Sequence, residues 1–183
     1  MNWPQVEIKN AARIVSGATP KSGTAKYWNG DIAWTTPKDL ARLDGKLITD
    51  TPRKITSEGL QNCSAELLPI GSVLFSSRAP IGHIAINTIP MATNQGFKSF
   101  IPGPDLDASF LYWWLDANRS RLQAMGNGAT FKEVSKAVVE RILIPLPPLA
   151  EQRRIAAILD QADVVRHKRR DALSRLADLP QGI

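Results

Sequence analysis

The sequence predicts an α+β protein, in which a domain with a mixed or antiparallel sheet is followed by one long C-terminal helix of the coiled-coil type. Three short strand-like stretches, each bounded by Gly, Pro or Asn, predict the sheet. Behind two prolines, apolar residues recur with a period of 3.5 as far as Leu179, which is the spacing of a coiled-coil seam. We therefore divide the chain into a globular domain at residues 1–148 and a helix at residues 149–180.

The first third of the chain has weak patterns. Residues 1–15 are compatible with a strand or a short helix, and residues 16–24 form a loop rich in glycine and hydroxyl groups. A strand is expected at 32–35, and the chain bends again at 36–40. A short helical turn is expected at 57–60.

The pattern becomes clearer in the middle of the chain. Strands are expected at 72–77, 83–86 and 97–101, with turn residues between them. A helix is expected over 107–126, capped by its first residue, an aspartate, and stopped by its last, a glycine. The spacing of Thr and Glu at the start of 130–140 is that of a capping box, which predicts a further helix there.

The C-terminal helix is expected to pair with a partner helix. Pro147 and Pro148 suit a helix entrance, because they lack donors that the first turn does not use. Arg169 is the one charged residue of the seam, and it either sets the register of pairing or bends out to solvent. The alternative is a single helix packed on its own domain. The predicted seam consists of Ile155, Ile158, Ala162, Val165, Arg169, Ala172, Leu176 and Leu179.

The composition favours a polyanionic partner. The 183 residues include 23 Lys and Arg against 17 Asp and Glu, a net charge of +6 that suits nucleic acid. The single cysteine, Cys63, excludes an internal disulfide. The N-terminus lacks the pattern of a signal peptide, and no apolar run is long enough to cross a membrane, so we expect a cytoplasmic protein.

The sequence contains no recognisable catalytic constellation. His83 and His167 are the only histidines, and carboxylates such as Asp39 and Glu66 are isolated from one another. No His, Cys or carboxylate set has metal-ligand spacing. The glycine-rich loop at 16–24 lacks the Gly-Lys-Ser/Thr of a phosphate-binding loop. We therefore expect a binding protein with no catalytic residue, metal or cofactor of its own.

Several loops mix basic, amide, hydroxyl and aromatic side chains, which are the groups that contact DNA phosphates and base edges. The glycines of these loops also have a simpler explanation in turn geometry. The candidate DNA-binding residues are Thr19, Lys21, Ser22, Lys26, Tyr27, Thr36, Lys38, Ser76, Ser77, Arg78, Thr93, Asn94, Gln95, Asn127, Thr130 and Lys132.

Five segments, taken in order, resemble one known family. They are SGATP at 16–20, YWNGDIAW at 27–34, SSRAPIG at 76–82, TNQGF at 93–97 and IPLPPLAEQ at 144–152. Together they resemble the specificity subunit of type I restriction-modification enzymes. Proteins of this family usually carry two target-recognition domains, each followed by a long helix, and the two helices pair antiparallel as a spacer.

The resemblance implies a non-catalytic DNA reader that recognises one half of a bipartite site in double-stranded DNA. Modification (methyltransferase) subunits would bring S-adenosylmethionine and methylate adenine, and motor-nuclease subunits would use ATP and Mg to cut. Since one domain and one helix are present, two copies are expected to form a homodimer that reads a gapped palindrome. The alternative is an assembly or regulatory half-subunit that pairs with a full specificity or modification subunit without reading DNA itself.

Overall fold

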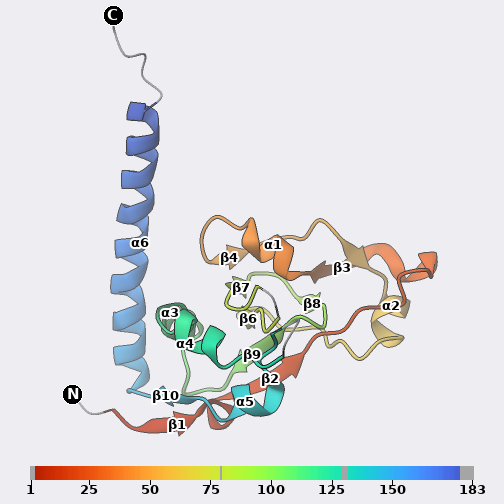
Figure 1. The fold of residues 1–183 in the computed structure, drawn as a ribbon, viewed down its shortest axis with the longest axis horizontal. Helices are drawn as coiled ribbons and strands as arrows, with labels where there is room; N and C mark the ends of the chain where they lie inside the picture. The colour runs from red at the N-terminus through yellow and green to blue at the C-terminus, as the bar shows by residue number, and fades with distance from the viewer. Residues whose placement is uncertain (1–2, 79, 129–131, 178–183) are drawn as a thin grey trace, which may run out of the picture.

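The computed structural model describes residues 3–78, 80–128 and 132–177, with side chains as far as Arg175. Its centre is a five-stranded sheet in the order β2-β9-β6-β7-β4 (Figure 1). Neighbouring strands are antiparallel except β4 and β7, which are parallel. The strands are β2 (Ala12–Ser16), β4 (Leu47–Ile48), β6 (Val73–Phe75), β7 (Ile84–Asn87) and β9 (Lys98–Pro102).

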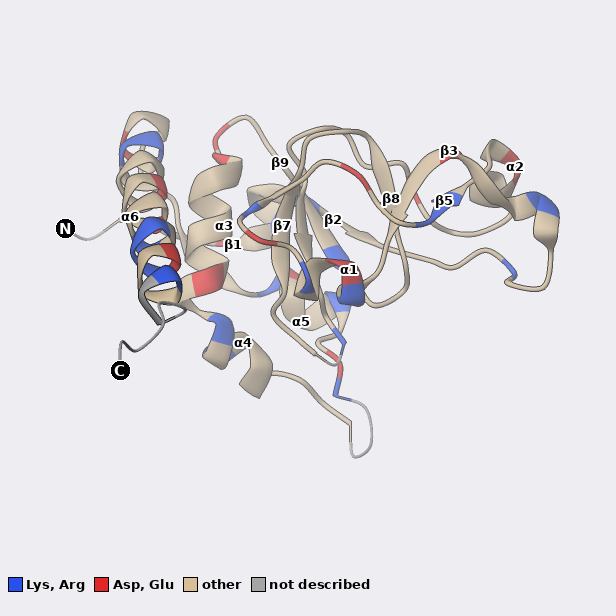
Figure 2. Ribbon diagram, turned by 90° about the horizontal axis from the view of Figure 1, so that it is seen from above, with Lys and Arg blue, Asp and Glu red and all other residues tan. Residues whose placement is uncertain are grey.

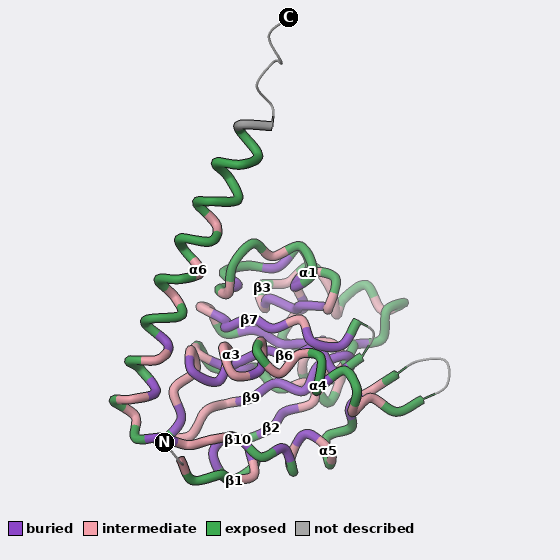
Figure 3. The backbone as a smooth tube through the Cα atoms, turned by 60° about the vertical axis from the view of Figure 1, so that its left-hand side comes forward, coloured by how far each residue is buried: buried purple, intermediate pink, exposed green. Residues whose placement is uncertain are grey.

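The central sheet is buried on both faces, as the purple tube of Figure 3 shows for β6, β7 and β9. Along β6, Val73 and Phe75 point into one apolar cluster, and Leu74 points into another on the opposite face. Helices and the 3-10 turn η1 contribute to the first cluster: η1 (Ile8–Asn10), α3 (Ala108–Ala117), α4 (Arg119–Ala124) and α5 (Lys136–Glu140).

A second, three-stranded sheet in the order β5-β3-β8 lies at the end of the molecule far from the C-terminal helix (Figure 1). Trp34, Ile55 and Ala92 form its small buried core. The elements of this region are η2 (Ala25–Tyr27), β3 (Trp28–Thr35), α1 (Pro37–Ala41), β5 (Lys54–Ile55), α2 (Ser57–Gln61) and β8 (Met91–Thr93).

The long helix α6 (Leu149–Ala177) stands on a third, two-stranded sheet of β1 (Gln5–Glu7) and β10 (Leu143–Pro145). Its first turns pack on α3, with Ala156 buried, whereas its last turns project beyond the globular part (Figures 1 and 3). None of the helices in the described part of the chain is long and apolar enough to cross a membrane.

The predicted α+β architecture with a long C-terminal helix is confirmed. The strands expected at 72–77, 83–86 and 97–101 correspond to β6, β7 and β9, and the turn expected at 57–60 is α2. The bend expected at 36–40 is a short helix, α1.

Two predictions about helices were wrong. The helix expected over 107–126 is broken at Asn118, whose side-chain amide donates to the Trp114 carbonyl at 2.8 Å and so ends α3 before α4 begins. The capping box expected at 130–133 does not start a helix at Glu133, which forms bridges with Arg78 and Asn127. Helix α5 begins later, capped by Ser135, and Thr130 lies outside the described residues.

Candidate nucleic-acid interface

The turn at residues 93–96 gathers three of the predicted loops around itself. The Ala18 N–H donates to the Thr93 carbonyl at 2.9 Å, and the Asn94 N–H donates to the Thr35 carbonyl, just before α1, at 3.0 Å. On the other side, the Ser77 N–H donates to the Gly96 carbonyl at 2.7 Å. Segments that are far apart in the sequence therefore meet at one place, at the ends of β2, β3 and β6.

A fourth loop joins this arrangement through Glu133. The Val134 N–H donates to the Ser77 carbonyl at 2.9 Å, and Glu133 accepts from Arg78 Nε at 2.8 Å and from Lys98 Nζ at 3.1 Å. Partial burial acts to raise the pKa of Glu133, but the hydrogen bonds from Lys98 and Arg78 outweigh it and hold that pKa below its ordinary value. We call residues 17–22, 36–39, 76–78, 93–96, 126–128 and 132–134 the loop cluster.

Two glycines permit this close packing. A Cβ atom at Gly17 would clash with the Asn94 carbonyl oxygen and the Thr93 hydroxyl, so the first loop can lie on the turn only without a side chain there. Gly128 has φ +125°, a conformation that an L-residue with a side chain avoids. Turn geometry thus explains Gly128, whereas Gly17 is required by the contact between two loops.

Half of the sixteen predicted DNA-binding residues are exposed on the loop cluster. Lys21, Lys38 and Lys132 have no carboxylate partner among the described residues. Figure 2 shows basic residues on α1 and on neighbouring loops. Asn94 is half-buried, and its side-chain oxygen accepts from the Gly96 N–H at 2.9 Å. The exposed residues are Thr19, Lys21, Ser22, Lys38, Arg78, Gln95, Asn127 and Lys132.

Four of the predicted contact residues have buried side chains, contrary to the exposure expected of a DNA contact. The Ser76 hydroxyl donates to the Pro80 carbonyl at 2.8 Å, and the Ser77 hydroxyl donates to the Gly96 carbonyl at 3.2 Å. Thr36 donates to Asp39 at 2.7 Å, and Thr93 is only 2% exposed. The hydroxyls of Thr36, Ser76 and Ser77 therefore form hydrogen bonds within the fold.

Lys26 and Tyr27 lie in η2, outside the loop cluster. Lys26 pairs with Glu58 of α2, and this hydrogen-bonded ion pair raises the pKa of Lys26. The Tyr27 backbone packs against Gly59 of the same helix. The contacts described for these two residues are therefore with α2 and its cap rather than with the turn at 93–96.

Arg53 lies at the edge of the loop cluster, although no sequence motif marked it as a candidate. Its guanidinium carbon is 4.5 Å from the ring centroid of Trp34. Trp34 in turn donates from Nε1 to the Ala18 carbonyl at 3.0 Å, which connects the pair to the first loop. Trp34 is in β3 and Arg53 immediately precedes β5, so their proximity was visible only in the folded chain.

The base of α6 is fixed to α3 by Gln152, a fully buried side chain. Its amide oxygen accepts from the Asp107 N–H at 2.8 Å, and its amide nitrogen donates to the carbonyls of Asp105 and Pro147, both at 2.8 Å. The Gln that ends the IPLPPLAEQ segment therefore fixes the direction in which the long helix leaves the globular part.

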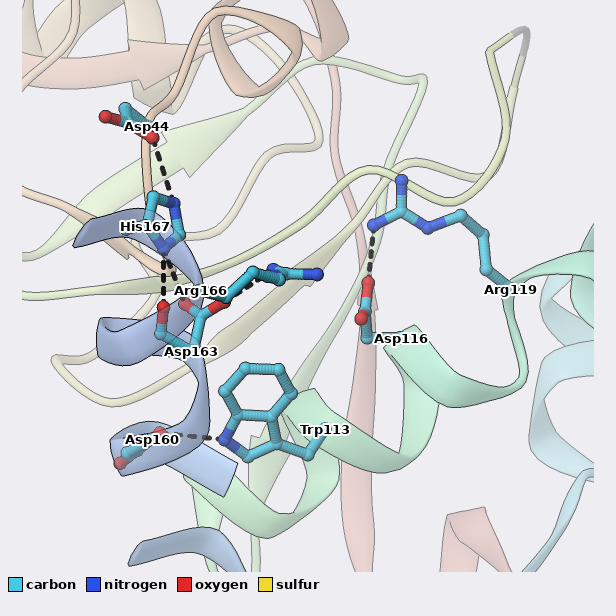
Figure 4. A network of polar contacts seen from close by, with 8 residues as sticks. All are labelled: Asp44, Trp113, Asp116, Arg119, Asp160, Asp163, Arg166 and His167. Carbon is cyan, nitrogen blue, oxygen red and sulfur yellow. Dashed lines mark hydrogen bonds and ion pairs between the residues drawn. The ribbon is translucent and has the colours of Figure 1, made fainter. Parts of the chain in front are cut away.

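Higher along α6, polar contacts connect the helix to α3 and to the loop after α1 (Figure 4). Asp160 accepts from Trp113 Nε1 at 2.7 Å and pairs with Lys46 at 2.5 Å. His167 lies 3.2 Å from a carboxylate oxygen of Asp44. The loop at 44–46 thus braces the middle turns of the helix, farther along α6 than the contacts of Gln152.

Most of the described residues of the predicted pairing seam are exposed. Ile155 is half-buried against the main core, whereas Ile158 is 52% and Val165 is 65% exposed. Ala162, Arg169 and Ala172 are also exposed. The Leu176 side chain and the whole of Leu179 lie outside the described part. Pairing through this seam stays a prediction, and the lower turns instead follow the alternative of packing on the domain.

No group of three or more His, Cys, Asp and Glu side chains within residues 3–78, 80–128 and 132–177 has the arrangement of a metal site. His83 is half-buried beside Arg119, and burial, followed by the charge of Arg119, lowers its pKa.

Comparison with known proteins identifies relatives across nearly the whole chain. Residues 1–173 match the family model described as "Type I restriction modification DNA specificity domain". The MjaIX type I restriction enzyme specificity subunit of Methanocaldococcus jannaschii is 34% identical over 96% of this chain and 42% of its own length. The EcoR124I/EcoR124II specificity subunit of Escherichia coli is 28% identical over 97% of this chain and 46% of its own length. The chain therefore spans about half the length of these curated relatives.

A solved structure has the same fold. The HsdS subunit of Thermoanaerobacter tengcongensis aligns with a TM-score of 0.70 and 27% identity, covering 98% of this chain and 40% of that one.

Proposed function

The chain belongs to the family of type I restriction-modification DNA specificity domains, and on that premise we propose that it reads one half of a bipartite site in double-stranded DNA. The observation that carries this proposal is the convergence of separate loops on the turn at 93–96. Their exposed side chains combine cations with amides, and DNA-reading proteins use these groups for phosphates and base edges respectively.

Within the loop cluster, we assign different roles to the two kinds of side chain. Lys21, Lys38 and Lys132 would contact phosphates, since an exposed lysine supplies a point charge without directional selectivity. Gln95 would contact a base edge. Its amide oxygen accepts from the Thr19 hydroxyl, which orients the amide and leaves its N–H donors available for adenine N7.

The long helix would position the reader relative to its partners. Two copies would pair through the exposed apolar residues of the predicted seam on α6, such as Ile158 and Val165, and form a homodimer with two reading surfaces. The same assembly would dock modification subunits, which bring S-adenosylmethionine, and motor-nuclease subunits, which bring ATP and Mg. The chain itself would supply no catalytic group, and the complex would act in the cytoplasm.

DNA reading is tested by combining the chain with its modification subunits and mapping methylated adenines by sequencing. Gln95→Ala should relax the preference at one position of the site, because one base loses the amide N–H donor that contacts it. Lys38→Ala should weaken binding to all sequences and reduce the salt dependence of affinity by about one unit of slope. Lys9→Ala, an exposed lysine on η1, is the control. If Gln95→Ala and Lys38→Ala both behave like Lys9→Ala, the assigned surface is wrong.

Pairing is tested by measuring the mass of the isolated chain in solution over a range of concentrations. The wild type should form a dimer, and Val165→Asp should shift it to a monomer because a charge would enter an apolar seam. Arg170→Asp changes an exposed position of the same helix outside the seam and should leave the dimer intact. A wild type that stays strictly monomeric at high micromolar concentration would rule out the homodimer.

A further inference from the structure

Arg53 rests on an aromatic platform at the edge of the loop cluster. Its guanidinium carbon lies 4.5 Å from the ring centroid of Trp34 and 5.8 Å from that of Trp28. The two indoles meet edge to face, with centroids 5.2 Å apart and planes at 88°. An arginine in contact with aromatic rings has its planar group oriented by them, so it loses less freedom when it binds a ligand.

The platform is itself held rigidly. Trp34 is 2% exposed, and its indole N–H donates to the Ala18 carbonyl at 3.0 Å. The carbonyl of Arg53 accepts from the Trp34 N–H at 3.1 Å and from the Thr51 hydroxyl at 2.7 Å, so the backbone that carries the side chain is anchored on both sides.

The donors of Arg53 remain available. The residue is exposed, and none of the carboxylates in the described part of the chain forms an ion pair with it. The neighbouring Lys54, by contrast, pairs with Asp50 at 3.3 Å. Among the cations of this region, Arg53 therefore combines an oriented planar group with the absence of an internal partner.

We propose that Arg53 is a specificity-determining residue that donates two hydrogen bonds to O6 and N7 of a guanine in the major groove. This inference rests on the proposed DNA-reading function, and it adds the identity of one base in the recognised site. A phosphate would need only positive charge, which the exposed Lys21 and Lys38 of the loop cluster already offer. A guanidinium held in a fixed plane matches the two acceptors on the edge of guanine.

The first experiment compares Arg53→Lys with the wild type, each combined with modification subunits, in a selection from a pool of random DNA duplexes. Lysine keeps the charge and much of the stem but loses the planar fork. We expect the wild type to enrich a motif with a guanine that Arg53→Lys no longer requires, and the affinity of Arg53→Lys for the wild-type motif to fall about 5- to 150-fold. Arg141→Lys, an exposed arginine at the end of α5, is the matched control and should enrich the wild-type motif.

The second experiment identifies the contacted atom. Each guanine of the selected motif is replaced in turn by 7-deazaguanine, which lacks the N7 acceptor. At one position the substitution should lower the affinity of the wild type. It should not lower the affinity of Arg53→Lys any further, because that variant already lacks the contact with N7.

The outcomes separate the inference from the proposed function. If the wild type enriches a motif and Arg53→Lys enriches the same one, DNA reading stands and the role of Arg53 in specificity is refuted. If Arg53→Lys lowers affinity equally for all sequences, Arg53 is a phosphate contact and the inference is also refuted. If the wild-type complex enriches no motif, the proposed function itself fails, and the inference with it. Thermal unfolding of Arg53→Lys should match the wild type, which excludes misfolding as the cause of a change.

Discussion

Replacing Gln152 should weaken the attachment of α6 to the start of α3. The Gln152→Ala variant loses three hydrogen bonds, each of 2.8 Å, and leaves the Asp107 N–H and the carbonyls of Asp105 and Pro147 without this partner. A hydrogen bond of this kind contributes about 0.5–1.5 kcal/mol, so the free energy of unfolding should fall by about 2–4 kcal/mol. For a chain of this size, that corresponds to a decrease of roughly 5–15 °C in Tm.

The assay is chemical denaturation followed by circular dichroism, supported by thermal unfolding. Gln161→Ala removes an exposed glutamine from the same helix and should change the free energy of unfolding by less than about 0.5 kcal/mol. Gln152→Met fills a similar volume without the amide, so it should be nearly as unstable as Gln152→Ala. If Gln152→Met instead restores stability, then packing and not hydrogen bonding holds the base of the helix. If Gln152→Ala matches Gln161→Ala, then Gln152 does not hold the base of the helix at all.

Three further variants test other contacts. Asp107→Ala removes the side chain that accepts from the Phe110 N–H at 2.9 Å, and it should lower the free energy of unfolding by about 0.5–2 kcal/mol, with Asp105→Ala as the control. Lys46→Met breaks the ion pair with Asp160. Because solvent surrounds part of that carboxylate, we expect the free energy of unfolding to fall by only about 1–2 kcal/mol in low salt. An effect no larger than that of Lys54→Met, which breaks the exposed pair with Asp50, would contradict the proposed brace. Glu133→Gln tests pH dependence. Because the pKa of Glu133 is lowered in the fold, its stabilising contribution is complete above the unfolded value of about 4.3 and is lost as the pH falls through the lower folded value. The variant should therefore be less stable than the wild type at pH 7 and should lose less stability on acidification below about pH 4; parallel pH profiles for the two proteins would refute this.

Elements that depend on local signals could be predicted from the sequence. The Asp107 cap, the strands around Phe75 and Phe100 and the entrance of α6 behind Pro148 each depend on residues close in the chain. The capping-box pattern at Glu133 was misleading because tertiary contacts took precedence: Arg78 and Lys98 occupy its carboxylate. A local sequence pattern shows which interactions a residue is able to form. Contacts with residues distant in the sequence determine which of these interactions it forms.

The same distinction applies to the candidate site. The loops that come together carry the residue types expected of a DNA reader, and glycine marked where they pack closely. Which hydroxyls face outward was not predictable, since Ser76 donates to a backbone carbonyl of its own loop and Ser77 donates to the Gly96 carbonyl of a distant turn. Arg53 could not be found because the two tryptophans of its platform are in β3, distant from it in the sequence.

The projecting end of α6 has a consequence for assembly. Beyond His167, every side chain as far as Arg175 is exposed, so the helix there has little tertiary support. A helix shorter than about 12–15 residues is only marginally stable in water by itself, and the amides from Lys168 to Ala177 should therefore exchange rapidly with deuterium in the free chain. The amides around Gln152 should exchange slowly. Slower exchange at the tip would then report its burial against a partner, and partner binding would include the cost of ordering those last turns.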